Sequence, residues 1–302
     1  MADPKLLIEG PLTNGSTTGP DLPLFLTEES TQSAETDTER ESVPTQDDEE
    51  SVMSPLTGRQ EVSYSGVADG QRLYNAGYGS DPKAALIRWL FEVESILQPQ
   101  QGEGYRVTDE MRNLVMEPVS GEEVGVIFDE VQWEHESGVP LNVEWDVDGK
   151  LTEGVQEADD RDSYIQEQID RQQGFTEDRL TGDGVDIPLG EVETRRYIRK
   201  IDLDMMDMVH QFDVPNVGVV ESGVEGEFEV DGRIAASQVN DLAEVSRIIT
   251  DEIHGQTVEV EDSLTGRAFR GVVNDSNTTF EAGVPNLLEY RIMLHIGEGI
   301  LD

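Results

Sequence analysis

Apolar and polar residues follow a regular order in the first half of the chain. Alternation predicts a β-strand over residues 59–67. Residues 79–97 then carry apolar side chains three and four positions apart, which predicts a helix with one buried stripe. Ser80 or Asp81 is placed to accept the free amides of its first turn. Three further strand candidates, bounded by Gly, Pro and Asp, follow at 105–111, 125–134 and 141–147.

The second half of the chain repeats this order. Alternation predicts a strand over 226–234, and residues 240–253 form a helix candidate with Leu242, Val245 and Ile249 on one face. Three strand candidates follow it, at 256–262, 267–275 and 286–299. The sequence therefore predicts a mainly β protein with packed helices (α+β), in which each half forms a small antiparallel barrel or sandwich with one helix.

A short sequence motif also occurs twice, 145 positions apart. The matched turn residues are Gly138, Val139 and Pro140 in the first copy and Gly283, Val284 and Pro285 in the second. Because identities cover both this turn and the strand after it, the sequence predicts an internal duplication of one structural unit. In each copy we expect Gly to supply a positive φ or a close backbone approach, and Pro to end strand pairing.

These patterns divide the chain into four parts. They are an acidic, extended or disordered arm (1–57), a first unit (58–154), a polar insertion or linker with a weak helix and a Gly-rich loop (155–190), and a second unit (191–302). The arm is either a dispensable tail or a segment that becomes ordered against a neighbour. In the second case, the apolar runs 6–12 and 22–26 are the parts that we expect to dock.

The charge balance indicates the conditions in which the protein works. The chain of 302 residues has 65 Asp and Glu against 21 Lys and Arg, a formal net charge of -44. Such charge repels itself strongly at low salt, whereas at molar salt the Debye length falls to roughly 3 Å and the repulsion is screened. We therefore expect a protein of a salt-loving host. Specific binding to nucleic-acid phosphates is disfavoured by the same charge.

Signals for catalysis, cofactors and metals are weak. Cysteine is absent, which excludes disulfides and thiolate chemistry. The four histidines are far apart, and no phosphate-binding loop or nucleophile elbow is present. Residues 144–155 superficially resemble a calcium loop, but Val155 stands where the loop needs an acid, so a tight hairpin turn is favoured. We expect no enzyme, no cofactor and no metal site, and a soluble chain without membrane insertion.

One basic cluster stands out in this acidic chain. Arg195, Arg196, Arg199 and Lys200 lie within an alternating segment at the start of the second unit. They are candidates for contact with an acidic surface of a neighbouring protein. The alternative, that they pair with acids of the same fold, is left equally open by the sequence.

Residues 232–299 resemble the tube-like domain of tailed-virus tails. The resemblance rests on the run "GRI", "NDLAEV", "QTVEVED", "GRAFRGVVND" and "AGVPNLLEYRIMLHIGEG", and it extends less closely to residues 60–154 through the duplication. This fold occurs in tail-tube proteins, distal tail proteins and baseplate hubs. The resemblance implies a chain that assembles with itself into a ring, as a trimer or hexamer, whose strands join edge to edge.

The same resemblance implies a function. We expect a structural virion protein at the tail tip of a virus of a halophilic archaeon, assembled in the host cytoplasm. Its acidic lumen would let DNA pass without specific binding, and neighbouring tail or baseplate proteins would be its other partners. Two alternatives remain: a halophilic β-rich enzyme or carbohydrate-binding module, and a component of a virus-related contractile injection system.

Overall fold

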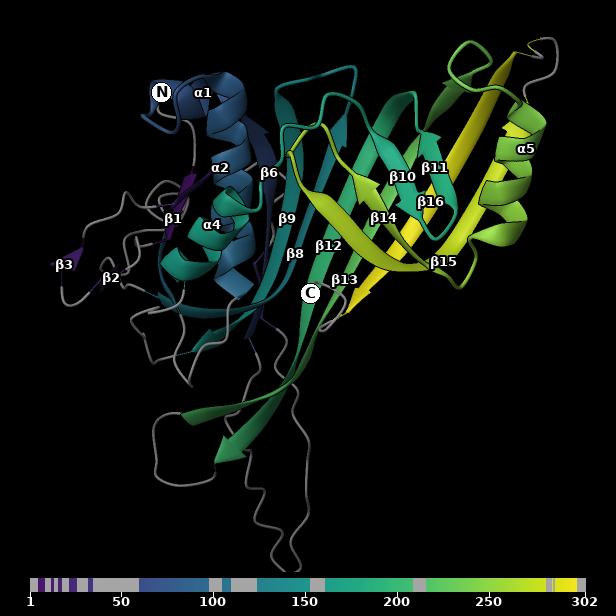
Figure 1. Cartoon of the computed structure of the whole chain (residues 1–302). Helices are drawn as coiled ribbons and strands as arrows, with labels where there is room; N and C mark the ends of the chain where they lie inside the picture. Colours follow the sequence, from purple (N-terminus) through teal and green to yellow (C-terminus); the bar gives the residue numbers. More distant parts are fainter. Residues whose placement is uncertain are drawn as a thin grey trace, which may run out of the picture.

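The protein is described here from a computed structural model, in which most strands belong to one large antiparallel sheet (Figure 1). The structure describes residues 5–8, 12–13, 16–17, 22–25, 32–34, 60–97, 105–109, 124–152, 161–208, 216–280, 284 and 286–297. The described residues form a 14-stranded sheet and a separate two-stranded ribbon. The mainly β fold class with few helices, predicted from the sequence, is thus confirmed.

Residues 60–152 contribute four strands and the helices beside them. They are β6 (Gln60–Asp69), α1 (Gly70–Asn75), α2 (Pro82–Glu94), η1 (Ser95–Leu97), β7 (Tyr105–Asp109), β8 (Val124–Glu136) and β9 (Asn142–Thr152). Asp81 caps α2 by accepting a hydrogen bond from the Ala84 amide, which the sequence had left open between Asp81 and Ser80. Helix α1 was not predicted; Asp69 caps it in the same way.

The second half follows the same order. Its elements are β13 (Asn216–Ala235), α5 (Leu242–Arg247), the π-helical turn η2 (Ile248–Glu252), β14 (Thr257–Glu261), β15 (Ala268–Phe280) and β16 (Leu287–Gly297). Asp241 caps α5 through the amides of Ala243 and Glu244. Helix α5 with η2 therefore fills the place of the single helix predicted over 240–253.

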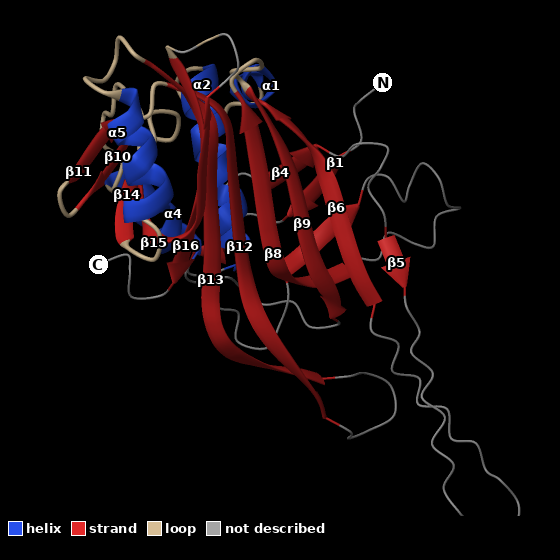
Figure 2. Ribbon diagram, turned by 90° about the vertical axis from the view of Figure 1, so that its right-hand side faces the viewer, coloured by secondary structure: helices blue, strands red, loops and turns tan. Residues whose placement is uncertain are grey.

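The segment predicted as a linker contains regular structure that joins the sheet. It holds α4 (Arg161–Asp170) and the hairpin β10 (Arg179–Gly182) and β11 (Val185–Pro188), and β10 pairs with β14. The prediction of a Gly-rich loop here was wrong, because Leu180, Ile187 and Leu189 are buried and anchor the hairpin. The long strand β12 (Glu191–Met208) follows and pairs with β13 along its length. The far end of this hairpin projects past the rest of the sheet (Figure 2).

The two halves share one pattern of strand pairing. In the first, β6 pairs with β9, β9 with β8, and β8 with β7; in the second, β13 pairs with β16, β16 with β15, and β15 with β14. Each half also contains a β-bulge. The ladder between β8 and β9 is interrupted between Phe128 and Glu130, and the ladder between β15 and β16 between Val273 and Asp275, which are the positions 145 residues later.

Strand β12 joins the two halves into one continuous sheet. One edge of β12 pairs with β8, from Thr194 opposite Glu136 to Lys200 opposite Glu130, and its other edge pairs with β13. The resulting path runs β6, β9, β8, β12, β13, β16, β15 and β14. Figure 2 shows these strands as one curved surface with the helices behind it.

The N-terminal strands lie on the side of the first half. They are β1 (Lys5–Ile8), β2 (Leu12–Thr13), β3 (Ser16–Thr17), β4 (Leu22–Phe25) and β5 (Gln32–Ala34). Strand β1 pairs with β4 and β7, and β5 pairs with β6. The two apolar runs singled out in the sequence, 6–12 and 22–26, thus overlap β1 and β4. The extent of the arm over residues 1–57 stays a prediction.

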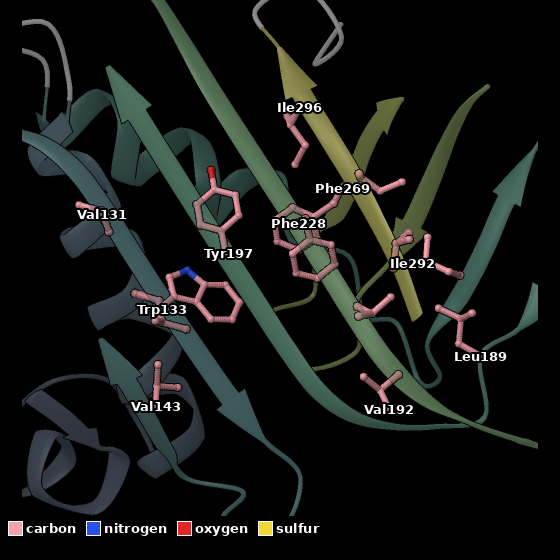
Figure 3. Packing of buried hydrophobic residues seen from close by; sticks show 14 of the residues in the cluster. Val131, Trp133, Val143, Leu189, Val192, Tyr197, Phe228, Phe269, Ile292 and Ile296 are labelled. Carbon is pink, nitrogen blue, oxygen red and sulfur yellow. The ribbon is translucent and has the colours of Figure 1, made fainter. Parts of the chain in front are cut away.

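The hydrophobic core lies on the helix-covered face of the sheet and crosses from one half to the other. Trp133 on β8 contacts Tyr197 on β12 with ring centroids 5.7 Å apart, and Tyr197 contacts Phe269 on β15 at the same distance. Phe269 stacks on Phe228 of β13 at 3.8 Å. Figure 3 shows these rings as one row across the strands. The core is therefore continuous where the two halves meet.

Candidate assembly surface

The face of the sheet opposite the core carries a band of carboxylates. We call this band the acidic face; its members alternate with core residues along three strands and are Glu130 and Glu134 on β8, Glu144, Asp146 and Asp148 on β9, and Glu227, Glu229 and Asp231 on β13. All but Glu144 are half-buried, because neighbouring side chains on a sheet stand close together. The sequence predicted the alternation but not that these acids share one surface.

Two members of the basic cluster of β12, Arg196 and Lys200, lie within this acidic face. Arg196 stands between Glu134 and Glu229 in the strand register, and its guanidinium donates to Gln132 Oε1 at 3.1 Å. Lys200 pairs with Glu130 at 2.8 Å. Arg199 lies on the other side of the sheet, in register with the core residue Val131; it is half-buried and has a partner within the fold. These contacts favour internal pairing for three of the four basic residues named from the sequence; their contact with another protein stays a proposal.

Arg195 points to the opposite face and is buried. Its Nε donates to Asp262 Oδ1 at 2.7 Å, and its terminal nitrogen donates to Asp178 Oδ2 at 2.8 Å. Asp178 also accepts hydrogen bonds from the amide and hydroxyl of Ser263. Because Arg195 is only 6% exposed, its side chain is not accessible for the contact with a neighbouring protein that the sequence suggested. It instead ties β12 to the turn before β15.

A second buried ionic cluster joins the two halves. Arg267, immediately before β15, donates to both carboxylate oxygens of Glu94 at 2.6 and 2.8 Å. Glu94 is the last residue of α2 and lies on its buried side; its carboxylate also accepts a hydrogen bond from Trp133 Nε1 at 3.0 Å. The guanidinium lies 4.8 Å from the ring centroids of both Phe91 and Phe269. Sequence reasoning missed this pair, although Glu94 falls four positions after Leu90, inside the predicted apolar stripe.

Crowding of carboxylates on the acidic face changes their proton affinity. Burial raises the pKa of Asp146 to about 6, and the charges of Asp148 and Glu130 act in the same direction. Burial likewise raises the pKa of Asp148. On β13, burial and the charge of Glu229 raise the pKa of Asp231 to about 6. The face therefore holds protons more tightly than free carboxyl groups do.

Replacing Asp146 with asparagine is expected to stabilise the protein at pH 8 and to leave stability unchanged near pH 3.5. The pKa of Asp146 in the folded protein lies above the ordinary value of 3.8. Its carboxyl group is therefore protonated in both the folded and the unfolded chain at low pH, and its ionisation lowers the stability of the fold as pH rises through about 4 to 6. After discounting for solvent screening we expect a gain of about 1 kcal/mol at pH 8. Urea unfolding at molar salt across this pH range measures it.

The matched control for Asp146 is Glu144→Gln, which removes an exposed carboxylate from the same strand. A gain at pH 8 as large as that of Asp146→Asn would show that net charge, not the half-buried position, sets the effect. An equal gain at pH 3.5 and pH 8 would contradict the raised pKa.

The repeated turn is exposed where the structure describes it. Gly138 and Pro140 lie in the turn between β8 and β9, and Val139 is 46% exposed. In the second turn Val284 is 40% exposed, whereas Gly283 and Pro285 lie outside the described residues. The expected role of Gly138 was wrong: its φ is not positive, and an added Cβ would meet nothing within 4 Å. The turn is instead held by Glu136, whose carbonyl accepts from the Val139 amide.

Histidines and other candidate ligands are dispersed. His135 is buried on β8, where desolvation lowers its pKa, and its Nε2 lies 3.4 Å from the Pro140 carbonyl. His254 is exposed, His295 is half-buried on β16, and His210 lies outside the described residues. In the part of the chain that the structure describes, no group of three or more His, Asp or Glu is placed to hold a metal ion.

One hollow of about 420 Å³ lies between α2 and the segment after α4, lined by residues that include Asp81, Lys83, Arg88 and Gln172.

None of the helices in the described ranges has the length and apolar character needed to cross a membrane. A scan of the sequence against protein-family models gives no match, and a search of curated proteins gives no significant match.

Proposed function

We propose that this chain is a structural virion protein that forms a ring at the tip of a viral tail, as a baseplate hub or a distal tail protein that continues the tube. The observation that carries the proposal is the shared architecture of the two halves. They have the same strand pairing and a bulge at positions 145 residues apart, between Phe128 and Glu130 and between Val273 and Asp275. We interpret them as two copies of one tube-like unit, over 58–154 and 191–302.

The join between the two units supports assembly through sheet edges. Inside the chain, β12 already pairs with β8 of one unit and β13 of the other, so the units form one surface. The same kind of join between chains would extend that surface around a closed ring. A ring of three or six chains is the assembly that we propose.

The acidic face suits the wall of a channel for DNA. Its carboxylates from β8, β9 and β13 exceed the cations placed among them, Arg196, Lys200, Arg233 and Arg291. Negative charge repels the phosphate backbone, which lets DNA pass without being held. The proposal places this face toward the lumen and the helices toward the outside of the ring.

Light scattering of the purified protein at molar salt, followed by negative-stain imaging, tests the ring. Trimers or hexamers with a central channel are the expected result. A compact monomer would contradict self-assembly and would favour a halophilic enzyme or carbohydrate-binding module. A component of a contractile injection system would also form rings, and the neighbouring genes distinguish it from a virion protein.

Lowering the salt to about 0.1 M is expected to dissociate the assembly. The Debye length then reaches roughly 10 Å, so the carboxylates of adjacent chains repel one another across the joint. The measurement is mass in solution from 0.1 to 2 M NaCl, with 2 M potassium glutamate as a control for a chloride-specific effect. An oligomer of constant mass over the whole range would contradict both the charge argument and the halophilic origin.

A further inference from the structure

Strand β15 has an open edge at the position where the equivalent edge of β8 is covered. In the first unit, residues 130–136 of β8 pair with β12. The matching part of β15 pairs with β16 on one edge, and among the described residues no strand pairs with its other edge beyond the contacts at Val273. Backbone groups on an edge of this kind are available to pair with another strand.

Side-chain exposure reports the same difference. Along β15, Asn274, Asp275, Asn277, Thr279 and Phe280 are exposed. None of the equivalent residues of β8, 129–135, is exposed. At the end of the strand, Phe280 is 45% exposed, whereas the equivalent His135 is 3% exposed. An exposed phenyl ring on an open edge indicates a surface that a further strand covers.

Strand β5 occupies, beside β6, the place that β12 occupies beside β13. Val147 and Ile292 are equivalent, because they lie 145 residues apart. Their partners on the neighbouring strand, Tyr64 and Val230, are therefore equivalent as well. Two residues earlier on the same strands, Val62 corresponds to Phe228. Phe228 pairs with Tyr197 of β12, and Val62 pairs with Gln32 of β5. The other edge of Tyr197 faces Trp133 of β8, whereas in the described chain β5 pairs with β6 alone.

The two open edges of one chain are too far apart to meet. Between β5 and β15 the sheet holds β6, β9, β8, β12, β13 and β16. At about 4.8 Å per strand this separates them by roughly 34 Å. Figure 2 shows β5 and β15 at opposite sides of the sheet. If β5 covers the open edge of β15, it must therefore be the β5 of another chain.

We propose that the open edge of β15 pairs in an antiparallel ladder with β5 of a second copy of this chain. The predicted register follows from the pairing of β12 with β8: Gln32 lies opposite Thr278 of the neighbouring copy, Ser33 opposite Asn277, and Ala34 opposite Ser276. The joint is head-to-tail, so each copy uses both edges and the contact closes into a ring when its rotation allows. The inference rests on the self-assembly in the proposed function and adds the strands that make the joint.

Cysteine crosslinking tests the register, because the chain has no cysteine of its own. Full-length Ser33→Cys/Asn277→Cys is oxidised mildly at 2 M NaCl and separated on non-reducing gels. Directly opposed residues lie within the span of a disulfide. We expect covalent multimers that reductant removes, in at least fivefold greater yield than for Ser33→Cys/Thr279→Cys, whose diagonal spacing of roughly 7–8 Å exceeds that span.

Two control experiments accompany the crosslinking of the double variant. Gln132→Cys/Ile198→Cys places cysteines at the equivalent pair inside one chain and is expected to oxidise without any gain in mass. A mixture of the single variants Ser33→Cys and Asn277→Cys, each of which keeps one edge unaltered, is expected to give covalent dimers only. This arm also replaces the double variant if that protein does not fold.

The outcomes separate this inference from the proposed function. Oligomers that form at molar salt without the in-register crosslink, while the intrachain pair oxidises, would overturn the joint between β5 and β15 and leave the ring standing. A protein that stays monomeric at molar salt would overturn both. A ladder of covalent products that ends at three copies would support the joint and identify a closed trimer.

Discussion

Arg267→Met is expected to lower the free energy of unfolding by about 3–5 kcal/mol. The substitution leaves Glu94 buried with Trp133 Nε1 as a remaining donor but without its two hydrogen bonds from the guanidinium. Removing one partner of a buried ion pair has an effect of this size, because the other charge stays desolvated and loses the opposite charge that balanced it. The substitution also removes the contacts of the guanidinium with the rings of Phe91 and Phe269.

Urea unfolding at 2 M NaCl, followed by tryptophan fluorescence, measures this loss. The double variant Arg267→Met/Glu94→Gln is expected to recover more than half of it, because it removes the buried charge that the guanidinium balanced and keeps an acceptor for Trp133. Arg247→Met is the matched control, since its ion pairs with Glu244 and Glu252 are exposed, and we expect a much smaller change. Equal losses for Arg267→Met and Arg247→Met would contradict the argument.

Local patterns predicted the elements of the fold more reliably than their partners. The helix over 79–97 and the strand over 226–234 follow from spacing alone, because each has one face in the core. The strands within residues 179–188 were missed, since Gly182 ends the first strand, Gly184 lies in the two-residue turn after it, and both interrupt a short alternation of Leu180 and Ile187. Short strands in a Gly-rich context carry too few apolar residues to be distinguished from a loop.

The candidate surface depended on contacts that no local pattern contains. That Arg196 stands between Glu134 and Glu229 follows from the register of three strands distant in sequence. The pairing of Arg267 with Glu94 likewise joins residues 173 positions apart. The sequence did contain one signal for it, a carboxylate within the apolar stripe of a helix, because a buried charge requires a partner. It could not say which of the arginines is that partner.

Gly232→Ala is expected to lower the free energy of unfolding by about 3 kcal/mol. Gly232 lies on β13 opposite Tyr290 of β16. An added Cβ would come within 2.6 Å of the Tyr290 hydroxyl oxygen and still closer to the Glu191 carbonyl oxygen. Neither neighbour can move freely, since Tyr290 is buried and Glu191 is backbone-paired to Arg233 at the start of β12. Overpacking of this kind forces the backbone of the sheet to shift.

Gly226→Ala is the matched control, because it lies on the same strand and its added Cβ would meet no atom closer than 3.4 Å. We expect it to change stability by less than about 1 kcal/mol, which urea unfolding at 2 M NaCl resolves. Gly66 holds the place of Gly232 in the first half, opposite Trp145. The same glycine–aromatic pair therefore occurs in both halves. If Gly232→Ala and Gly226→Ala behaved alike, the close packing of Tyr290 on β13 would be contradicted.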